Sequence, residues 1–129
     1  MILLDTHVLL WLSGEPRKLS RRATQAIKRA HNSGGLAISS VSLFEVAYLA
    51  ARGRIVLKVR LDDFLAEIEA RFTIQPLTRV VAATAAGLPE AFPADPMDRI
   101  IAATAQANHM ALVTADERIR AANLFETVW

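Results

Sequence analysis

The sequence predicts an α/β domain with a short, mainly parallel central sheet that helices cover. Short apolar segments of strand length alternate along the chain with longer segments of helical periodicity, the order typical of βαβ units. The strand segments are almost continuously apolar, as expected where both faces of a sheet are buried. The 129 residues are enough for one domain with its own core, so we expect a single domain over residues 1–129.

The first third of the chain contains two predicted strands and two predicted helices. The apolar run at 2–5 predicts a strand, and 7–13 predicts a brief helix that ends in the turn sequence SGEP. Ser20 is a typical N-cap for a helix of about a dozen residues, which the following Gly-Gly pair ends. The segment LAIS at 36–39 predicts the second strand.

The middle of the chain predicts three helices and one strand. The apolar-rich segment 42–53 predicts a helix that ends at its glycine. Residues 61–72 place apolar side chains on one helical face. The segment TIQPL at 73–77 predicts a third strand, and 78–87 predicts a helix closed by a glycine.

The last third predicts a long helix, two strands and a short helix between them. Pro96 suits the first position of a helix over 96–109. The segment MALVTAD at 110–116 predicts a strand, a short helix follows, and ETVW at 126–129 predicts the final strand.

Composition excludes several classes of protein. No apolar run approaches the roughly 20 residues needed to span a bilayer, so we expect no membrane partner. No basic segment precedes the first apolar run, so we expect no signal peptide. The absence of cysteine excludes disulfides and thiolate metal sites, and it fits the reducing cytoplasm, where we expect the protein to act. The net charge of +2 is compatible with a nucleic-acid partner but does not require one.

Five acidic residues lie near the ends of predicted strands or the starts of predicted helices. Asp5 and Asp116 end predicted strands, and Glu45 lies just after the second strand. Asp95 and Asp98 begin the long helix. Because open parallel sheets bind ligands at the carboxyl ends of their strands, we expect acids from distant parts of the chain to converge there.

Helix capping is the alternative explanation for several of these residues. Ser42 and Glu45 fit a capping box, which leaves Glu45 open between a cap and a site residue. We expect Asp95 to be the N-cap of the long helix, with Asp98 at its third position. Thr114 is a possible cap for the short helix that follows.

A cluster of acids requires neutralisation. Two carboxylates about 5 Å apart repel each other by about 3 kcal/mol at an effective dielectric constant of about 20. Carboxylate oxygens and water are the ligands that Mg²⁺ and Mn²⁺ prefer, and these ions also bind phosphates. The three histidines lack the spacing of a zinc site. We therefore expect metal-assisted hydrolysis of a phosphodiester.

Four segments together resemble the PIN-domain nucleases and, more narrowly, the VapC-type toxins of toxin–antitoxin pairs. They are LLDTHVLLW at 3–11, ISSVSLFEVA at 38–47, DPMDRIIAATA at 95–105 and LVTAD at 112–116. The resemblance extends over essentially the whole chain. It implies a PIN-like three-layer fold.

The resemblance assigns the catalytic and metal-binding roles to four acids, hereafter the acidic cluster: Asp5, Glu45, Asp98 and Asp116. In that family such acids surround one or two Mg²⁺ or Mn²⁺ ions and cleave RNA. Thr6 and Thr114 match hydroxyl positions that orient a carboxylate or a metal-bound water, and Asp95 is a cap and outer contributor.

The resemblance also implies a homodimer and a small cognate antitoxin that lays a peptide across the groove and places a basic side chain among the acids. Two alternatives remain open: an RNA-processing nuclease without an antitoxin, and a non-catalytic RNA-binding module. Arg99 follows Asp98 directly, and we expect either an ion pair with that acid or a contact with the substrate. For His7 we expect packing or a hydrogen bond at the helix start.

Overall fold

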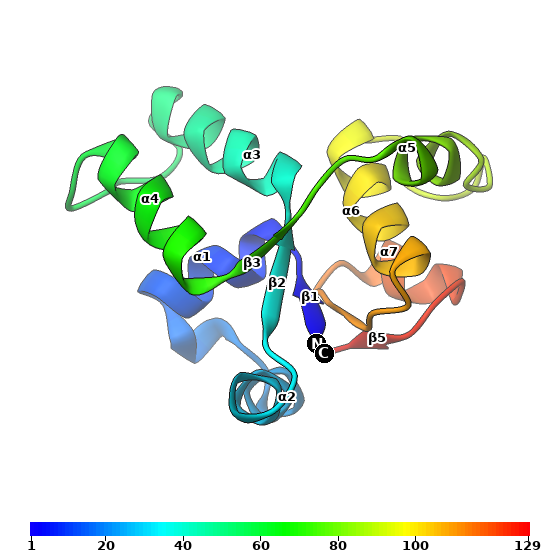
Figure 1. Ribbon diagram of the computed structural model, residues 1–129, viewed down its shortest axis with the longest axis horizontal. Coiled ribbons are helices and arrows are strands. Elements are labelled where there is room, and N and C mark those ends of the chain that lie inside the picture. Colours follow the sequence, from blue (N-terminus) through cyan, green and yellow to red (C-terminus); the bar gives the residue numbers. More distant parts are fainter.

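A five-stranded sheet in the order β3-β2-β1-β4-β5 lies at the centre of the computed structural model, which describes residues 1–129 (Figure 1). All four strand pairs are parallel, which confirms the predicted fold class. The strands are β1 Ile2–Leu4, β2 Leu36–Ser39, β3 Thr73–Gln75, β4 Leu112–Val113 and β5 Thr127–Val128.

Seven α-helices connect and cover the strands, and a single 3₁₀ turn at Pro16–Lys18 follows the first helix. The helices are α1 Thr6–Gly14, α2 Arg21–Asn32, α3 Ser40–Ala51, α4 Leu61–Arg71, α5 Arg79–Ala86, α6 Pro96–Ala107 and α7 Glu117–Ala122. Every predicted helix and strand is present. The largest difference is β4, for which seven residues were predicted and only two pair with the neighbouring strands.

Local signals explain where several elements begin and end. The Ser20 hydroxyl accepts a hydrogen bond from the Ala23 N–H (3.0 Å), as its predicted N-cap role requires. Gly35 joins α2 to β2 with a φ of 95°, a backbone conformation that glycine adopts without strain. Pro76 follows β3, and proline has no N–H with which to continue a sheet.

Alternate residues of each inner strand face opposite layers. Leu4 of β1 and Ile38 of β2 belong to a core that α1, α2, α3 and α4 complete. Leu3 and Ala37 point the other way, into a core formed with α6 and α7. Figure 1 shows α1 to α4 on one side of the sheet and α5 to α7 on the other. The structure therefore has three layers, as the resemblance implies.

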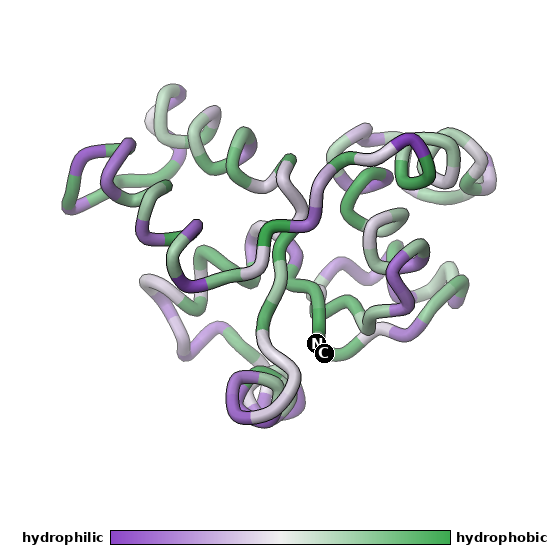
Figure 2. Tube along the Cα trace, viewed as in Figure 1, coloured by the Kyte–Doolittle hydropathy of each residue, from purple (hydrophilic) through white to green (hydrophobic).

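Hydropathy follows this arrangement. Figure 2 shows continuous hydrophobic stretches along the inner strands, whereas hydrophilic and hydrophobic residues alternate along α2 and α4. None of the helices has both the length and the apolar character that crossing a bilayer would require.

The carboxyl edge of the sheet positions the candidate site. Strand β1 runs directly into Asp5, which caps α1, and β2 ends at Ser39, which caps α3. Asp116 caps α7 three residues after the end of β4. Because the three strands are parallel neighbours, these caps lie at the same edge of the sheet.

Candidate active site

Asp5 is a buried carboxylate with a hydrogen bond to each oxygen. Its side chain is only 5% exposed. Its Oδ1 accepts from the Thr6 N–H (2.8 Å), and its Oδ2 accepts from Thr114 Oγ1 (2.8 Å) on the neighbouring strand end. Both oxygens of this buried carboxylate therefore have a hydrogen-bond donor, as a buried polar group requires. The predicted position of Asp5 and the predicted orienting role of Thr114 agree with this geometry.

Glu45 reaches the same edge from α3. Thr6 Oγ1 donates to Glu45 Oε1 (2.5 Å) and lies 2.9 Å from Ser42 Oγ. Because Thr6 has a single hydroxyl hydrogen, the Ser42 hydroxyl donates to Thr6 when Glu45 is ionised. Burial raises the pKa of Glu45, and the nearby charge of Asp5 raises it further, while the hydrogen bond from Thr6 opposes the rise.

The capping box predicted for Ser42 and Glu45 is wrong. Helix α3 begins at Ser40, because Ser39 is its N-cap and accepts from the Val41 N–H (3.3 Å). Ser42 and Glu45 therefore lie inside the helix, one turn apart, and both face Thr6. Glu45 has no capping role.

Asp116 is connected to Asp5 through one hydroxyl group. Thr114 Oγ1 donates to Asp5 and accepts from the Asp116 N–H (3.1 Å). Asp116 Oδ1 accepts from the N–H groups of Arg118 (2.9 Å) and Ile119 (3.2 Å), so Asp116 is the N-cap of α7. The alternative that Thr114 caps this helix is wrong, because its hydroxyl bonds the N–H of Asp116, which lies outside the helix.

Asp95 and Asp98 begin α6 as predicted. Asp95 Oδ1 accepts from the N–H groups of Met97 (2.8 Å) and Asp98 (3.3 Å), with Pro96 at the first helical position. Asp98 is half-buried, and no group of the protein donates a hydrogen bond to its carboxylate. Of the acidic cluster, Asp98 therefore has the least compensated charge.

The charges of the acidic cluster act on one another. Burial is the largest cause that raises the pKa of Asp98, which reaches about 7. The negative charges of Asp5, Asp95, Asp116 and Glu45 raise it further, in that order. Acids separated by up to 111 positions in the sequence are thus close enough in space for their charges to change the pKa of Asp98. Asp5, Glu45, Asp95 and Asp116 therefore lie within electrostatic range of Asp98.

The donor set suits a hydrated hard cation. No group of three or more acidic or histidine side chains is close enough together to hold a metal ion by direct ligands alone. Mg²⁺ does not need such a cage, because it retains several waters and commonly takes one or two carboxylates from the protein. A divalent ion would also relieve the mutual repulsion that raises the pKa of Asp98. The residues fit Mg²⁺ or Mn²⁺ on these grounds.

His7 and Arg99 have structural contacts. His7 Nε2 accepts from the Ala115 N–H (3.0 Å), which leaves the ring proton on Nδ1, 3.6 Å from Asp5 Oδ2. The His7 ring also packs against Trp11, with centroids 4.9 Å apart, so the expected packing is confirmed. Arg99 forms no ion pair with Asp98; its guanidinium donates to main-chain carbonyls instead.

Sequence reasoning missed Ser42 as a member of the site. Its hydroxyl is fully buried and lies 2.9 Å from the Thr6 hydroxyl. Ser42 therefore helps to position the Thr6 hydroxyl that donates a hydrogen bond to Glu45. The spacing of Ser42 and Glu45, three positions apart, would place them on one helical face, but the same spacing also fits a capping box. Only the register of α3 separates the two interpretations.

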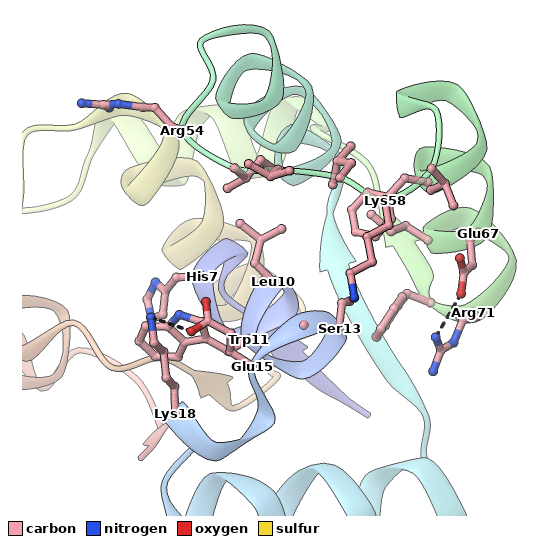
Figure 3. Close-up of a pocket in the computed structure, with 18 residues that line it drawn as sticks. His7, Leu10, Trp11, Ser13, Glu15, Lys18, Arg54, Lys58, Glu67 and Arg71 are labelled. Carbon is pink, nitrogen blue, oxygen red and sulfur yellow. Dashed lines mark hydrogen bonds and ion pairs between the residues drawn. The ribbon is translucent and has the colours of Figure 1, made fainter.

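A groove of about 830 Å³ lies along α1, on the side of the sheet that α4 covers (Figure 3). Helix α1, the 54–59 loop and α4 line it, with apolar side chains such as Trp11 and Phe64. In Figure 3, Lys58 extends into the groove, whereas Arg54 points away from it. His7 lines the groove and its Nδ1 lies 3.6 Å from Asp5 Oδ2, whereas none of the acidic cluster lines the groove itself.

Comparisons with known proteins agree with this architecture. The family model described as "PIN domain" matches residues 2–123. Ribonuclease VapC22 of Mycobacterium tuberculosis (strain ATCC 25618 / H37Rv) is 43% identical over 120 residues, which cover 93% of this chain and 90% of the relative.

Two solved structures share the fold. One is the structure of VapBC2 from Rickettsia felis bound to a DNA fragment from the VapBC2 promoter. A chain in it has a TM-score of 0.74 at 18% identity, and the match covers 98% of this chain and 97% of that chain. A chain of a toxin–antitoxin complex from Klebsiella pneumoniae has a TM-score of 0.70 at 23% identity, with 100% of this chain and 97% of that one covered.

Proposed function

Because the chain belongs to the PIN-domain family, we propose that it is a metal-dependent endoribonuclease and the growth-inhibiting toxin of a toxin–antitoxin pair. The observation that carries the proposal is the acidic cluster, whose members come from four different helices or their N-caps. Burial, and then the charges of the other acids, raise the pKa of Asp98 to about 7. A relative of 43% identity is named a ribonuclease. We also propose that the protein acts in the cytoplasm.

The acidic cluster would hold Mg²⁺ or Mn²⁺ through Asp98 and Asp5, with Glu45 and Asp116 as direct or water-mediated partners. The ion, when bound, supplies an activated water and stabilises charge on the scissile phosphate. Hydroxyl groups of the protein orient two of these acids. Thr114 holds Asp5, and Thr6 holds Glu45.

Cleavage of RNA by the purified protein tests the activity. We expect cleavage with Mg²⁺ or Mn²⁺, no cleavage with EDTA, and loss of cleavage in Asp5→Asn, which removes a charge but keeps the side-chain shape. The matched control is Glu69→Gln, an exposed acid on α4, which should cleave like the wild type. Stable RNA binding without cleavage, unchanged in Asp98→Asn, would instead support a non-catalytic RNA-binding module.

Induction in cells tests the toxin role. The wild-type protein should arrest growth and Asp5→Ala should not, and sequencing of the cleaved RNA ends should identify the substrate. Equal toxicity from both proteins would contradict the mechanism. A nuclease that cleaves RNA without arresting growth, and whose gene has no short upstream reading frame for an antitoxin, would be an RNA-processing enzyme.

The groove supports the proposed antitoxin partner. Its apolar residues, Trp11 and Phe64 among them, would accept the apolar face of a peptide, and His7, which lines the groove, lies 3.6 Å from Asp5. A basic side chain of that peptide would then meet the acidic cluster. Phe64→Asp should weaken binding of the cognate antitoxin while leaving RNA cleavage by the free toxin in place, because Phe64 lies on the α4 wall.

An exposed apolar surface supports the proposed homodimer. Phe44 and Tyr48 of α3 are 58% and 44% exposed, and their ring centroids lie 5.9 Å apart. The Leu77 N–H donates to Ser40 Oγ (3.2 Å), which places Leu77 one helical turn from Phe44. A second copy would cover this surface. Phe44→Glu should reduce the mass measured by light scattering from that of a dimer to that of a monomer.

A further inference from the structure

Arg99 belongs to α6, and its guanidinium lies among the residues that connect α5 to α6. All five of its N–H donors are directed at main-chain carbonyls. The acceptors are Pro93 O (3.0 Å), Leu88 O and Pro89 O (both 3.2 Å), Phe92 O (3.3 Å) and Ala85 O (3.4 Å). The guanidinium also lies over the Phe92 ring, 5.9 Å from its centroid.

These contacts replace regular secondary structure in the connection. Residues 87–95 contain neither helix nor strand, so their carbonyls take no part in the regular hydrogen bonds of a helix or a sheet. Ala85 lies in the last turn of α5, where a carbonyl lacks an intrahelical partner and favours a cation. The planar fork of an arginine can serve five acceptors at once, whereas a lysine has three donors on one nitrogen.

The same connection delivers Asp98 to the acidic cluster. It ends at Asp95, whose Oδ1 accepts from the Asp98 N–H (3.3 Å). Helices α5 and α6 pack against each other. Asp98 receives no hydrogen bond from another side chain, so its place depends on the backbone that carries it. Arg99 fixes that backbone.

We propose that Arg99 is a positioning residue: its guanidinium holds the 87–95 connection and thereby keeps Asp98 in place to bind the divalent cation. Arg99 does not touch the acids, and its side chain is directed away from Asp98 to the carbonyls of the connection. The inference rests on the proposed function, because it assigns Arg99 a role in metal binding.

Arg99→Lys tests the inference, because it keeps the positive charge and removes the planar fork. We expect the Mn²⁺ concentration for half-maximal RNA cleavage to rise about 10- to 100-fold, the range seen when outer contacts of metal ligands are lost. The rate should recover at saturating Mn²⁺. Direct binding of Mn²⁺, measured by electron paramagnetic resonance without RNA, should weaken by the same factor. Hydrogen exchange of the 87–95 amides should accelerate in the metal-free variant.

A purely structural role gives a different result. It would lower the melting temperature and the active fraction and leave the half-maximal Mn²⁺ concentration unchanged, which would overturn the inference. Arg22→Lys, on the exposed face of α2, is the matched control and should bind Mn²⁺ like the wild type. If Arg99→Lys does not fold, Phe92→Leu decides, because it removes the ring that contacts the guanidinium while keeping an apolar side chain at this buried core position. It should shift Mn²⁺ affinity in the same direction, and an unchanged affinity would overturn the inference.

The wild-type protein separates the two proposals. If it neither binds Mn²⁺ nor cleaves RNA, the proposed function fails and the role of Arg99 fails with it. If it does both, and the variants retain its Mn²⁺ affinity, only the role of Arg99 fails.

Discussion

Asp98→Asn should stabilise the metal-free protein while it abolishes cleavage. Asparagine has nearly the shape of aspartate but carries no charge, so the substitution removes a half-buried carboxylate that receives no hydrogen bond from the protein. Burial and the charges of the neighbouring acids disfavour the ionised form of Asp98 in the fold. The unfolded chain has neither effect.

The pKa of Asp98 gives the size of the effect and its dependence on pH. Its rise from 3.8 to about 7 sets an upper limit of about 4 kcal/mol of unfolding free energy, since one pKa unit is about 1.4 kcal/mol. Because Asp98 is only half-buried, solvent screening reduces the expected stabilisation to about 1–2 kcal/mol. Between these values the folded protein binds a proton that the unfolded chain does not, so stability falls as pH rises. The advantage of Asp98→Asn should therefore be absent near pH 4, grow through pH 7 and be complete at pH 8.

Urea unfolding in EDTA, followed by tryptophan fluorescence at several pH values, measures this difference. The two tryptophans, Trp11 and Trp129, have ring centroids 5.7 Å apart and should report the loss of packing. The difference between variant and wild type reports the charge of Asp98 together with its coupling to the neighbouring acids, because the ionisable groups away from the cluster are common to both. Glu69→Gln is the control and should change stability by less than about 0.5 kcal/mol at every pH.

Two results would refute the reasoning. The first is an unfolding free energy of Asp98→Asn equal to or below that of the wild type at pH 8. The second is a stabilisation that does not change with pH, since it would come from packing rather than charge. Addition of Mn²⁺ should stabilise the wild type and not the variant.

Two further substitutions test single contacts of the site. Thr114→Val keeps the side-chain shape but leaves Asp5 Oδ2 without its hydrogen-bond donor. The unfolding free energy measured by urea titration should therefore fall by about 1–3 kcal/mol. Unchanged stability would show that this hydrogen bond is dispensable. Asp95→Ala removes the N-cap of α6 and should lower the unfolding free energy by about 1 kcal/mol. Since Asp95 also raises the pKa of Asp98, the variant should lower that pKa, as nuclear magnetic resonance titration would detect, and an unchanged pKa would contradict the assignment.

Features that depend on neighbouring residues were predictable from the sequence. The N-cap roles of Ser20 and Asp95 and the start of α6 at Pro96 depend on contacts within one helical turn. The places of Asp5 and Asp116 at the carboxyl edge follow from the alternation of strands and helices, because parallel strands end at the same edge.

Features that depend on helix register were not predictable. A Ser-x-x-Glu pattern fits a capping box, but β2 continues directly into α3 and shifts the helix start to Ser40, which turns Glu45 toward Thr6. Arg99 follows Asp98 in the sequence, yet consecutive residues on an α-helix point about 100° apart. The side chain of Arg99 therefore meets the carbonyls of the preceding connection and not the neighbouring acid.

The sequence by itself determined the layered parallel architecture and which acids lie at the ends of its strands, because periodicity and capping act over a few residues. The tertiary structure decided how those acids are held: the hydroxyl of Thr114 bonds Asp5 from 109 positions away, and that of Thr6 bonds Glu45 from 39 positions away. It also decided that Asp98 has no such donor. These contacts depend on distances between separate elements, which no local pattern contains.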